Sequence, residues 1–521
     1  MTKQSFIKGT MILLAAGMIN RILGFIPRIT LPRVIGPEGV GLYQMGYPFL
    51  ILILTFITGG IPIAVAKLVA EAEAEANEAR VRRIFRTALL LSCALGLFFT
   101  ALSYLGAGWI TRHFFTDQRV YYTFLCMNPI IFFVSISAVL RGYFQGRQNM
   151  IPTAMSQVVE TLFRIIFVLI LSYLMLPYGL EFAAAGAMVG VLIGEICALL
   201  VLAYHYKTDR KIRPTRPKAK IGSSLAPGRL YGLRQLLGLA VPVTGSKLVG
   251  SASYLLESIL TVQALAAAGI VTAVATAQYG ALQGMVIPVL LLPSALTYSL
   301  SVSLVPSLSD AKARGDMATI HARLHQSLKL ALVTGAPFAV IMFVLAEPLC
   351  LYMYGQQQVG TMLKMMAPVA LFIYFQAPLQ AALQALERPG SALINTFIGS
   401  SAKLLIIYFV ASRPEYGILG VVMAINVNIV LVTLLHWNSL VRLLSFRMNS
   451  SDFVKVLFAM TPAGALSYLT MYTSWTDYAF VRFVTASAAG VTLYLIFALI
   501  FGLIDRNDLS RFTRLSKRIV K

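Results

Sequence analysis

The chain has 521 residues, of which 58% are hydrophobic and only 12% are charged, and its mean hydropathy is +0.78. The charged share is about half of the roughly 25% found in soluble globular domains, so a water-soluble enzyme or binding domain of this length is excluded. The formal net charge of +23 would suit a nucleic-acid partner. The positions of the basic residues, described below, point to membrane orientation instead.

Apolar runs of 18 or more residues recur along the whole chain, and each is long enough to cross a bilayer as a helix. Lipid offers no hydrogen-bond partners, so these runs must pair their backbone groups internally, and no alternating β-barrel pattern is present. The predicted spans are 9–31, 41–66, 87–109, 121–141, 154–176, 182–206, 236–263, 280–305, 328–347, 365–386, 391–411, 417–440, 454–474 and 482–504. The predicted fold class is therefore all-α and integral to the membrane, with about fourteen transmembrane helices. Residues 264–279 are predicted to form an alanine-rich outer connection.

The N-terminal residues are basic and precede an apolar run, as in a signal peptide. This run is long, contains Asn20 and Arg21, and has no small-residue cleavage pattern after it, so we expect a retained first helix. With a cytoplasmic N-terminus, 32 of the 43 Lys and Arg fall in cytoplasmic segments, seven in outer segments and four inside spans. This bias follows the positive-inside rule and predicts that both termini are cytoplasmic. Attraction to anionic membrane lipids would add to it.

The longest basic stretch is 207–235, with nine Lys or Arg and one Asp. Its Pro, Gly and Ser content predicts a flexible cytoplasmic linker. The four cysteines, which have neither metal-ligand nor disulfide spacing, are interpreted as small packing residues: Cys93, Cys126, Cys197 and Cys350.

A shift of 239 residues lays the first half of the chain on the second. Met127, Pro129, Phe133, Ala138, Leu140 and Gln145 fall on Met366, Pro368, Phe372, Ala377, Leu379 and Gln384. Gly41 and Gln44 fall on Gly280 and Gln283, and Glu71-Ala72 falls on Asp310-Ala311. Each repeat holds six spans, an even number, so the two repeats are predicted to be parallel, with a substrate site between them as in many transporters. The predicted domains are an N-lobe (1–206), the linker (207–235), a C-lobe (236–440), and two extra helices with a basic cytoplasmic tail (441–521).

Ionisable side chains near the bilayer centre cost about 2.5–3.5 kcal/mol each, so they usually face a cavity or a partner. Arg21 lies roughly 18 Å into the first span at 1.5 Å per residue, slightly past its middle, and Arg28 lies nearer the outer edge. The other ionisable residues of interest in the predicted spans are Glu160, Arg164, Glu195, Lys247, Glu257 and Lys403.

These residues have structural alternatives. Glu160 and Arg164 are four apart and can neutralise each other on one helix face. Glu195 can pair with a basic residue elsewhere, and Arg28 can extend to the outer headgroups. No acidic residue lies three or four positions from Arg21, Lys247 or Lys403. We predict that the substrate-binding residues are Arg21, Arg28, Lys247 and Lys403, and that the coupling or structural charges are Glu160, Arg164, Glu195 and Glu257.

Cations near the midplane suit an anionic substrate. A diphosphate headgroup fits, because guanidinium groups bind phosphate oxygens through bidentate hydrogen bonds. Outward movement of negative charge from a negative interior gains about 2.3 kcal/mol per charge per 100 mV.

Glycine and proline interrupt two of the predicted spans. Gly59-Gly60-Ile61-Pro62 breaks the second span, and Pro288 and Pro293 break the eighth, its counterpart in the repeat. Paired breaks indicate moving helices that line a site, so these residues are candidate hinges. The alternative is ordinary packing, because Gly and Pro are common in membrane helices.

The sequence has no Walker A loop, no HExxH motif and no nucleophile elbow, and no soluble stretch is long enough for a catalytic domain. We therefore expect a protein that is not an enzyme and that needs no cofactor or metal. Residues 67–86 and 306–329 are predicted to be amphipathic helices on the cytoplasmic side. His321 and His325 lie in the second and are interpreted as solvated residues rather than a metal site.

Four segments carry a family resemblance: KGTMILLAAGMINRILGFIPR, GPEGVGLYQM, IPIAVAKLVAEAEAE and RGYFQGRQNMIPTAMSQVVE. They resemble the stage V sporulation protein B family, in the polysaccharide-transporter branch of the multidrug/oligosaccharidyl-lipid/polysaccharide exporter superfamily. The peptidoglycan lipid II flippase MurJ is a relative. The match is dense over residues 1–160, and its most specific piece is 141–149.

The resemblance implies a V-shaped, two-lobed transporter that works by alternating access without ATP hydrolysis, with a cavity lined by spans one, two, seven and eight. Arg21 and Arg28 match the first-span arginines that are thought to meet the substrate diphosphate. Two differences stand out: one extra residue separates the two arginines, and 280–305 has no arginine where MurJ-type flippases carry one. Lys247 is the candidate substitute.

The first hypothesis is a flippase for an undecaprenyl-diphosphate-linked peptidoglycan precursor or related oligosaccharide, serving spore cortex or cell-wall synthesis in the cell membrane. The alternatives are a cation-coupled multidrug exporter, favoured by Glu160, Glu195 and Glu257, and a membrane scaffold of a wall-synthesis complex. The expected partners are the lipid-linked sugar, membrane lipids and wall-synthesis polymerases, and not nucleic acid.

Overall fold

The computed structural model describes residues 6–212 and 229–503. The middle of the predicted linker 207–235 and the basic tail after residue 503 lie outside the described residues. Every regular element in the described part is a helix, and no β-strand occurs there. By packing, the chain divides into two compact units: Met1–Gly284 with Ile407–Ile418, and Met285–Ile406 with Leu419–Lys521.

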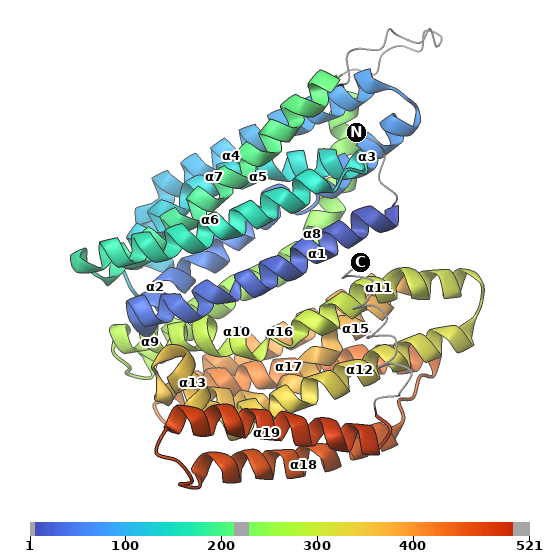
Figure 1. Cartoon of the computed structure of the whole chain (residues 1–521). Helices are drawn as coiled ribbons and strands as arrows, with labels where there is room; N and C mark the ends of the chain where they lie inside the picture. The colour runs from blue at the N-terminus through green and yellow to red at the C-terminus, as the bar shows by residue number, and fades with distance from the viewer. Residues whose placement is uncertain (1–5, 213–228, 504–521) are drawn as a thin grey trace. The chain divides into compact units, whose positions relative to one another are not determined.

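The first unit holds nine long or medium helices and two short turns of helix. They are α1 (Phe6–Leu23), α2 (Phe25–Thr58), α3 (Ile61–Ala74), α4 (Glu78–Phe114), α5 (Val120–Gly146), α6 (Ile151–Met175), η1 (Leu176–Tyr178), α7 (Leu180–Ile212), α8 (Arg229–Ala267), α9 (Thr272–Ala281) and the π-helical η5 (Ile407–Ala411). Helices α4, α5, α7 and α6 pack side by side in that order (Figure 1). Helices α8 and α9 pack against α2, which places them in this unit.

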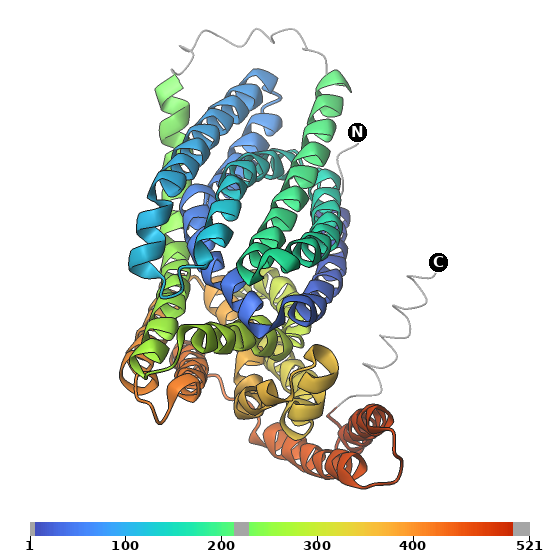
Figure 2. The same ribbon diagram turned by 90° about the vertical axis from the view of Figure 1, so that its left-hand side faces the viewer.

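The second unit follows the π-helical turn η2 (Leu282–Val286), at the boundary between the units. Its helices are α10 (Ile287–Leu290), α11 (Ser294–Ala313), α12 (Met317–Val344), α13 (Ala346–Tyr354), η3 (Gln357–Val359), α14 (Gly360–Met366), η4 (Ala367–Val369), α15 (Ala370–Ala385), α16 (Pro389–Ile406), α17 (Gly417–Leu444), α18 (Ser450–Tyr472) and α19 (Ala479–Ile500). The last two helices pack on each other and on α12 (Figure 2). The buried Tyr494 hydroxyl of α19 donates to Val333 O of α12 at 2.9 Å.

Thirteen helical segments among the described residues are long and apolar enough to cross a membrane. The first of them, Ala15–Ala74, contains both of the first two predicted spans. Within it the chain changes direction at Gly36, whose φ of 68° is a left-handed conformation that suits glycine. The all-α membrane class with about fourteen spans is therefore confirmed.

The alanine-rich segment 264–279 is not the connection that the sequence predicted. Helix α8 continues to Ala267 and α9 already begins at Thr272, so the connection is only a short turn, with Gly269 at φ 81°. Residues of α9 are apolar or small and lie buried, which stabilises a helix there: Ala275, Thr276, Tyr279 and Gly280. The predicted eighth span, 280–305, therefore begins inside α9 and continues across the break at 291–293 into α11, and the most apolar part of this region is Thr272–Leu290.

The two predicted amphipathic helices, 67–86 and 306–329, are also wrong as separate elements. Each range instead holds the end of one helix, a tight turn and the start of the next helix: α3 and α4 in the first, α11 and α12 in the second. In the first, the Asn77 side chain caps α4 by accepting from Arg80 N at 2.9 Å. In the second, Asp316 caps α12 by accepting from Thr319 N at 3.0 Å. A side-chain cap at each start lets the following helix begin at once.

These turns give the internal repeat a structural register. Five pairs of backbone landmarks are separated by 239 positions. They are the helix ends Ala74 and Ala313, the helix starts Glu78 and Met317, the helix ends Gly146 and Ala385, and two pairs of left-handed residues, Ala76 with Gly315 and Gln148 with Glu387. Equivalent positions thus end and begin helices in both halves. The parallel six-helix repeats of the predicted fold class are supported by backbone geometry as well as sequence. The division by packing differs from the repeat-based lobes, whose boundaries stay a prediction.

Helices α2 and α9 cross at a pair of repeat-equivalent glycines. A Cβ atom added to Gly280 would lie 2.1 Å from Pro37 O and 2.4 Å from Gly41 N. A Cβ atom on Gly41 would lie 2.1 Å from Thr276 O. Only glycine at both positions lets the two backbones approach this closely.

Candidate functional site

The two arginines that the sequence singled out lie on either side of Gly24. Helix α1 ends at Leu23 and α2 begins at Phe25, but Gly24 keeps a right-handed helical conformation, with φ −64° and ψ −12°. Arg21 lies in the last turn of α1 and Arg28 in the first turn of α2, and both residues are exposed. Two guanidinium groups therefore lie seven residues apart in one membrane segment.

Arg28 belongs to a group of polar side chains from three helices of the first unit. This arginine–tyrosine cluster consists of Arg28, Tyr43 and Tyr47 of α2, Arg164 of α6 and Tyr254 of α8. Helix α2 packs against both α6 and α8, so the three helices that carry these residues lie together. The rings of Tyr43 and Tyr47 are 6.3 Å apart between centroids. The cluster thus combines two cations and three hydroxyl groups, a set that suits phosphate and sugar oxygens.

Next to this cluster, four charged residues form a continuous network. Arg141 Nη2 of α5 lies 2.9 Å from Glu160 Oε2 of α6 and 3.8 Å from Glu195 Oε1 of α7. The other oxygen of Glu160 lies 3.3 Å from Arg164 Nη1. The predicted Glu160–Arg164 pair is present, but it is part of a larger network that Arg141 extends to Glu195.

Glu257 has a different environment from the other membrane carboxylates. It is buried on α8, and its Oε1 accepts from Gln283 Nε2 at 2.9 Å. One turn away, Tyr279 donates to Ser258 Oγ at 2.9 Å. The interactions of Tyr254 with both Glu257 and Arg28 connect this pair to the arginine–tyrosine cluster.

Lys247 lies at the break that Gly59 and Gly60 introduce between α2 and α3. Its Nζ donates to Gly59 O at 2.8 Å, a carbonyl at the helix end. A Cβ atom on Gly60 would lie 2.0 Å from Ala240 O of α8, so the break allows close packing of that helix. Pro62 occupies the first turn of α3, where its missing N–H costs nothing. This contact gives Lys247 a structural role at the break.

The second predicted break lies in the second unit and has another form. Pro288 is in the first turn of α10, and Pro293 is the N-cap of α11. The sequence predicted breaks at corresponding positions. Under the 239-residue shift Gly59 falls on Tyr298, which lies inside α11, so the two breaks are offset by several residues.

Lys403, the remaining predicted cation, is in α16 of the second unit and is only 7% exposed. Asn395, two turns earlier on the same helix, donates to Ser439 Oγ of α17 at 2.9 Å. Arg28 and Arg164 therefore lie on two packed helices of the first unit, whereas Lys403 is buried in the second unit.

A further ion cluster lies at one end of the first unit, around Arg147. The Arg147 side chain is only 2% exposed and lies 3.2 Å from Glu73, 2.6 Å from Glu78 and 3.7 Å from Asp209. It joins the ends of α3, α4 and α7 to α5. Arg147 and Arg141 are the two arginines of the RGYFQGRQN segment, so this segment supplies one cation to each network.

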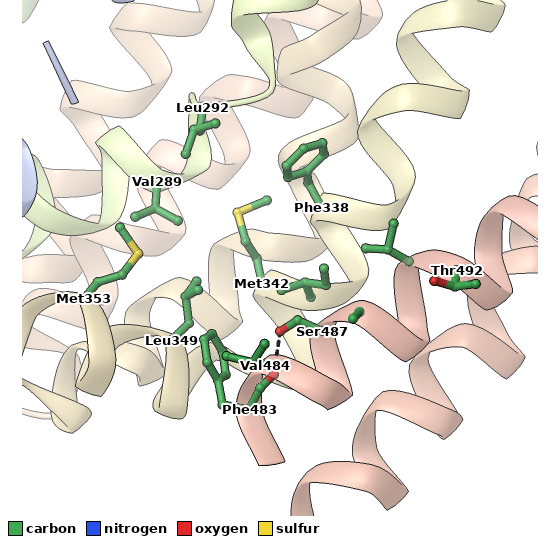
Figure 3. A pocket seen from close by; sticks show the side chains of 13 residues that line it. Val289, Leu292, Phe338, Met342, Leu349, Met353, Phe483, Val484, Ser487 and Thr492 are labelled. Atoms are coloured by element: carbon green, nitrogen blue, oxygen red, sulfur yellow. Dashed lines mark hydrogen bonds between the residues drawn. The ribbon is translucent and has the colours of Figure 1, made fainter. Parts of the chain in front are cut away.

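The second unit contains an apolar pocket of about 600 Å³. Figure 3 shows Phe338 and Met342 of α12 facing it together with Phe483 and Val484 of α19. Its only hydroxyl groups are those of Ser487 and Thr492, and Ser487 donates to Phe483 O at 2.8 Å. Such a lining accommodates a hydrocarbon chain and offers nothing to a charged headgroup.

No group of three or more His, Cys, Asp or Glu side chains that could hold a metal ion occurs in the described part of the chain. His325 Nε2 lies 3.3 Å from Asp452 Oδ2, linking α12 to α18, and the His321 ring packs against Phe446. Both histidines thus have interactions that require no metal.

Sequence reasoning missed Arg141 and the three tyrosines. The predicted fourth span ended at residue 141, but α5 continues to Gly146, so Arg141 is inside the helix. The RGYFQGRQN segment was a usable signal, because it contains Arg141. Nothing in the helical periodicity indicated that α2, α6 and α8 would bring Tyr43, Tyr47 and Tyr254 toward two arginines.

Comparison with known proteins identifies the family. The sequence model of a family described as polysaccharide biosynthesis protein matches residues 6–312. The chain belongs to this family. Among curated members of similar sequence, Stage V sporulation protein B of Bacillus subtilis (strain 168) is 40% identical over 524 residues, which covers 100% of both chains. Lipid II flippase MurJ of the same organism is 27% identical over 425 residues, covering 77% of this chain and 76% of that protein.

Solved structures show the fold of this polysaccharide biosynthesis protein family member. The structure of lipid II flippase MurJ in an inward closed conformation has a TM-score of 0.71 at 19% identity, covering 94% of this chain and 98% of that one. An inward-facing multidrug resistance MATE family transporter has a TM-score of 0.64 at 15% identity, covering 82% and 94%. The chain is thus a multi-pass membrane protein with the fold of these transporters, as the family resemblance predicted.

Proposed function

We propose that this chain moves an undecaprenyl-diphosphate-linked peptidoglycan precursor, or a related oligosaccharide, from the inner to the outer leaflet by alternating access. We further propose that it serves spore cortex or cell-wall synthesis. The observation that carries the proposal is the arginine–tyrosine cluster, because Arg28, Tyr43 and Tyr47 lie on α2, and α2 packs against the helices that carry Arg164 and Tyr254. Guanidinium groups would hold the diphosphate, and tyrosine hydroxyls would hold sugar or phosphate oxygens.

Arg21 is assigned to the same task, since it lies seven residues before Arg28 in the same membrane segment. Lys247 and Lys403 are secondary candidates for contact with the headgroup. The relatives support a lipid-linked sugar as cargo: the names of two of them refer to sporulation and to lipid II. The apolar pocket of the second unit suits the polyprenyl tail, whose long hydrocarbon chain requires a lining without charge.

The proposed transport involves no chemical reaction by the protein itself. The electrical potential across the membrane supplies a driving force, because outward movement of a negative headgroup gains about 2.3 kcal/mol per charge per 100 mV. Wall-synthesis polymerases on the outer side would consume the delivered precursor and are the partners that we expect.

The test is transbilayer movement of a fluorescent undecaprenyl-diphosphate sugar in proteoliposomes. Wild type, Arg21→Ala and Arg28→Ala are compared at matched amounts of folded protein. The matched control is Arg112→Ala, an exposed arginine at the end of α4, away from the cluster. We expect the Arg28 variant to lose about tenfold or more in rate, the effect of removing one hydrogen bond to a charged group, and the control to be unchanged.

Three results would contradict parts of this proposal. Normal transport by both variants would make the two arginines structural and leave the activity in place. Failure of folded wild type to move several such lipids would reject the flippase function. Proton- or sodium-driven export of a cationic dye by the same vesicles would then favour the drug-exporter alternative.

A further inference from the structure

Glu195 is the most enclosed member of the membrane charge network. Its residue is 5% exposed, and it lies near the middle of the long helix α7. Its Oε1 atom is buried and makes no hydrogen bond, and the nearest cation, Arg141 Nη2, is 3.8 Å away. The Oε1 atom therefore lacks the direct hydrogen bond that normally stabilises a buried charge, and the Ser137 hydroxyl of α5 also lies close to the carboxylate.

The cation nearest to Glu195 is already committed to another carboxylate. Arg141 Nη2 is closer to Glu160 Oε2, at 2.9 Å, and Arg141 Nε is buried without a hydrogen bond. Arg141 is therefore shared unequally between two carboxylates. Whether Glu195 carries a charge determines how strongly Arg141 is held toward each of them.

The same network reaches the arginine–tyrosine cluster. Glu160 is the link, since its second oxygen lies 3.3 Å from Arg164 Nη1. Arg164 is itself a member of the cluster. The order along the network is thus Glu195, Arg141, Glu160 and Arg164.

The charged and titratable groups around Glu195 are the following. Helix α5 contributes Arg141, α6 contributes Glu160 and Arg164, and α2 contributes Tyr43 beyond Arg164. Two arginines and two ionised glutamates make the network neutral. Addition of one proton to Glu195 gives the network a net charge of +1 and frees Arg141 to pair fully with Glu160.

We infer that Glu195 is a proton-binding site that sets the affinity of the arginine–tyrosine cluster for an anionic headgroup. When a proton occupies Glu195, Arg141 satisfies Glu160, and Arg164 is less neutralised and binds phosphate oxygens more strongly. By linkage, binding of the anion favours uptake of the proton by the same factor. This inference rests on the proposed function, because it takes the cluster as the anion-binding site.

The first experiment measures the Kd of fluorescent undecaprenyl diphosphate for the full chain in nanodiscs of neutral lipid, between pH 5.5 and pH 8. Wild type is compared with Glu195→Gln, which mimics the protonated state, and with Glu181→Gln. Glu181 is in the first turn of the same helix, roughly 21 Å away at 1.5 Å per residue. It is the matched control.

As the pH rises from 5.5 to 8, the Kd of wild type should increase by about tenfold more than the Kd of Glu195→Gln. A factor of this size is typical of the coupling between two binding sites. Glu195→Gln should bind tightly at every pH, and Glu181→Gln should follow wild type. The same pH dependence in wild type and Glu195→Gln would overturn the inference, and so would weaker binding by the glutamine variant at all pH values.

A second measurement needs no variant and so remains decisive if Glu195→Gln does not fold. A polyprenyl sulfate, whose headgroup stays ionised across this pH range, is mixed with wild type in weak buffer, and proton uptake is recorded. Uptake supports the inference, and its absence during binding overturns it. If the diphosphate lipid is flipped without any proton linkage, the inference is rejected and the proposed function is kept. If that lipid is not bound and not flipped, the inference and the proposed function are both rejected.

Discussion

The Asp117 carboxylate is held by three groups at one end of the first unit. Its side chain is 3% exposed, and Thr276 Oγ1 donates to Oδ2 at 2.9 Å. Arg119 donates to it through both its backbone N–H, at 3.0 Å, and its guanidinium, at 2.8 Å, and also contacts Glu38 at 2.7 Å. Burial alone would raise the pKa of Asp117, but the hydrogen bonds from Arg119 and Thr276 outweigh it and keep the pKa below its ordinary value.

This arrangement predicts a specific loss of stability in acid. A carboxyl group whose pKa is lower in the folded state stabilises that state above its unfolded pKa, about 3.9, and this contribution disappears as the pH falls through the folded pKa. Asp117→Asn removes it, so at pH 7 the variant should be less stable by about 1.5–3 kcal/mol, the worth of a hydrogen bond to a charged group. The difference in Tm between wild type and variant should shrink below about pH 4.

The matched control for this measurement is Asp477→Asn, a carboxylate in the turn between α18 and α19. Its Tm should equal that of wild type at each pH. A difference between Asp117→Asn and wild type that persists unchanged at pH 3 would show that the Asp117 charge does not stabilise the fold.

At the scale of helices, the structure depends on where membrane segments are interrupted. The break between α2 and α3 is required by packing, because Gly60 lies directly against the Ala240 backbone of α8. The carbonyl that it exposes on Gly59 is satisfied by Lys247. The break, the close approach and the partly buried hydrogen bond are therefore parts of one joint.

A methyl group at Gly60 should disrupt this joint. Its Cβ would be 2.0 Å from a carbonyl oxygen, so the helices must separate, at a cost of about 1–3 kcal/mol for overpacking. The control is Gly250→Ala on α8, where an added Cβ meets nothing within 4 Å and helix propensity improves by about 0.5–1 kcal/mol. We expect Gly60→Ala to lower Tm and Gly250→Ala to leave it equal or slightly higher. Equal Tm values for Gly60→Ala and wild type would mean that α8 does not need this contact.

At the scale of the whole chain, the basic residues predict the orientation. If the N-terminus is cytoplasmic, the turn that follows α3 is cytoplasmic and the turn between α6 and α7 is outside. Both turns have exposed residues that tolerate a label, Ala74 and Tyr178.

Labelling of intact cells with a membrane-impermeant maleimide checks this orientation. In a variant without the four native cysteines, Tyr178→Cys should be labelled, and Ala74→Cys should be labelled only after the membrane is opened. The reverse pattern would invert the topology and, with it, the proposed direction of transport.

The helical membrane class was predictable because it depends only on the length and hydropathy of each run. Positions set by tertiary packing were not predictable. Residues 272–281 read as a connection because short alanine-rich segments are ambiguous, yet burial against α2 makes them a helix. For the candidate site, Arg28 and the Glu160–Arg164 pair were predictable, since these need only helical spacing. Arg141 and the tyrosines needed the arrangement of α2, α5, α6 and α8.

The contact between Gly41 and Gly280 locates the axis that relates the two repeats. Residues that occupy the same position in two repeats normally lie apart, and they touch only beside a two-fold axis. The axis therefore passes next to this crossing, and any change at one glycine displaces the backbone that carries its repeat equivalent.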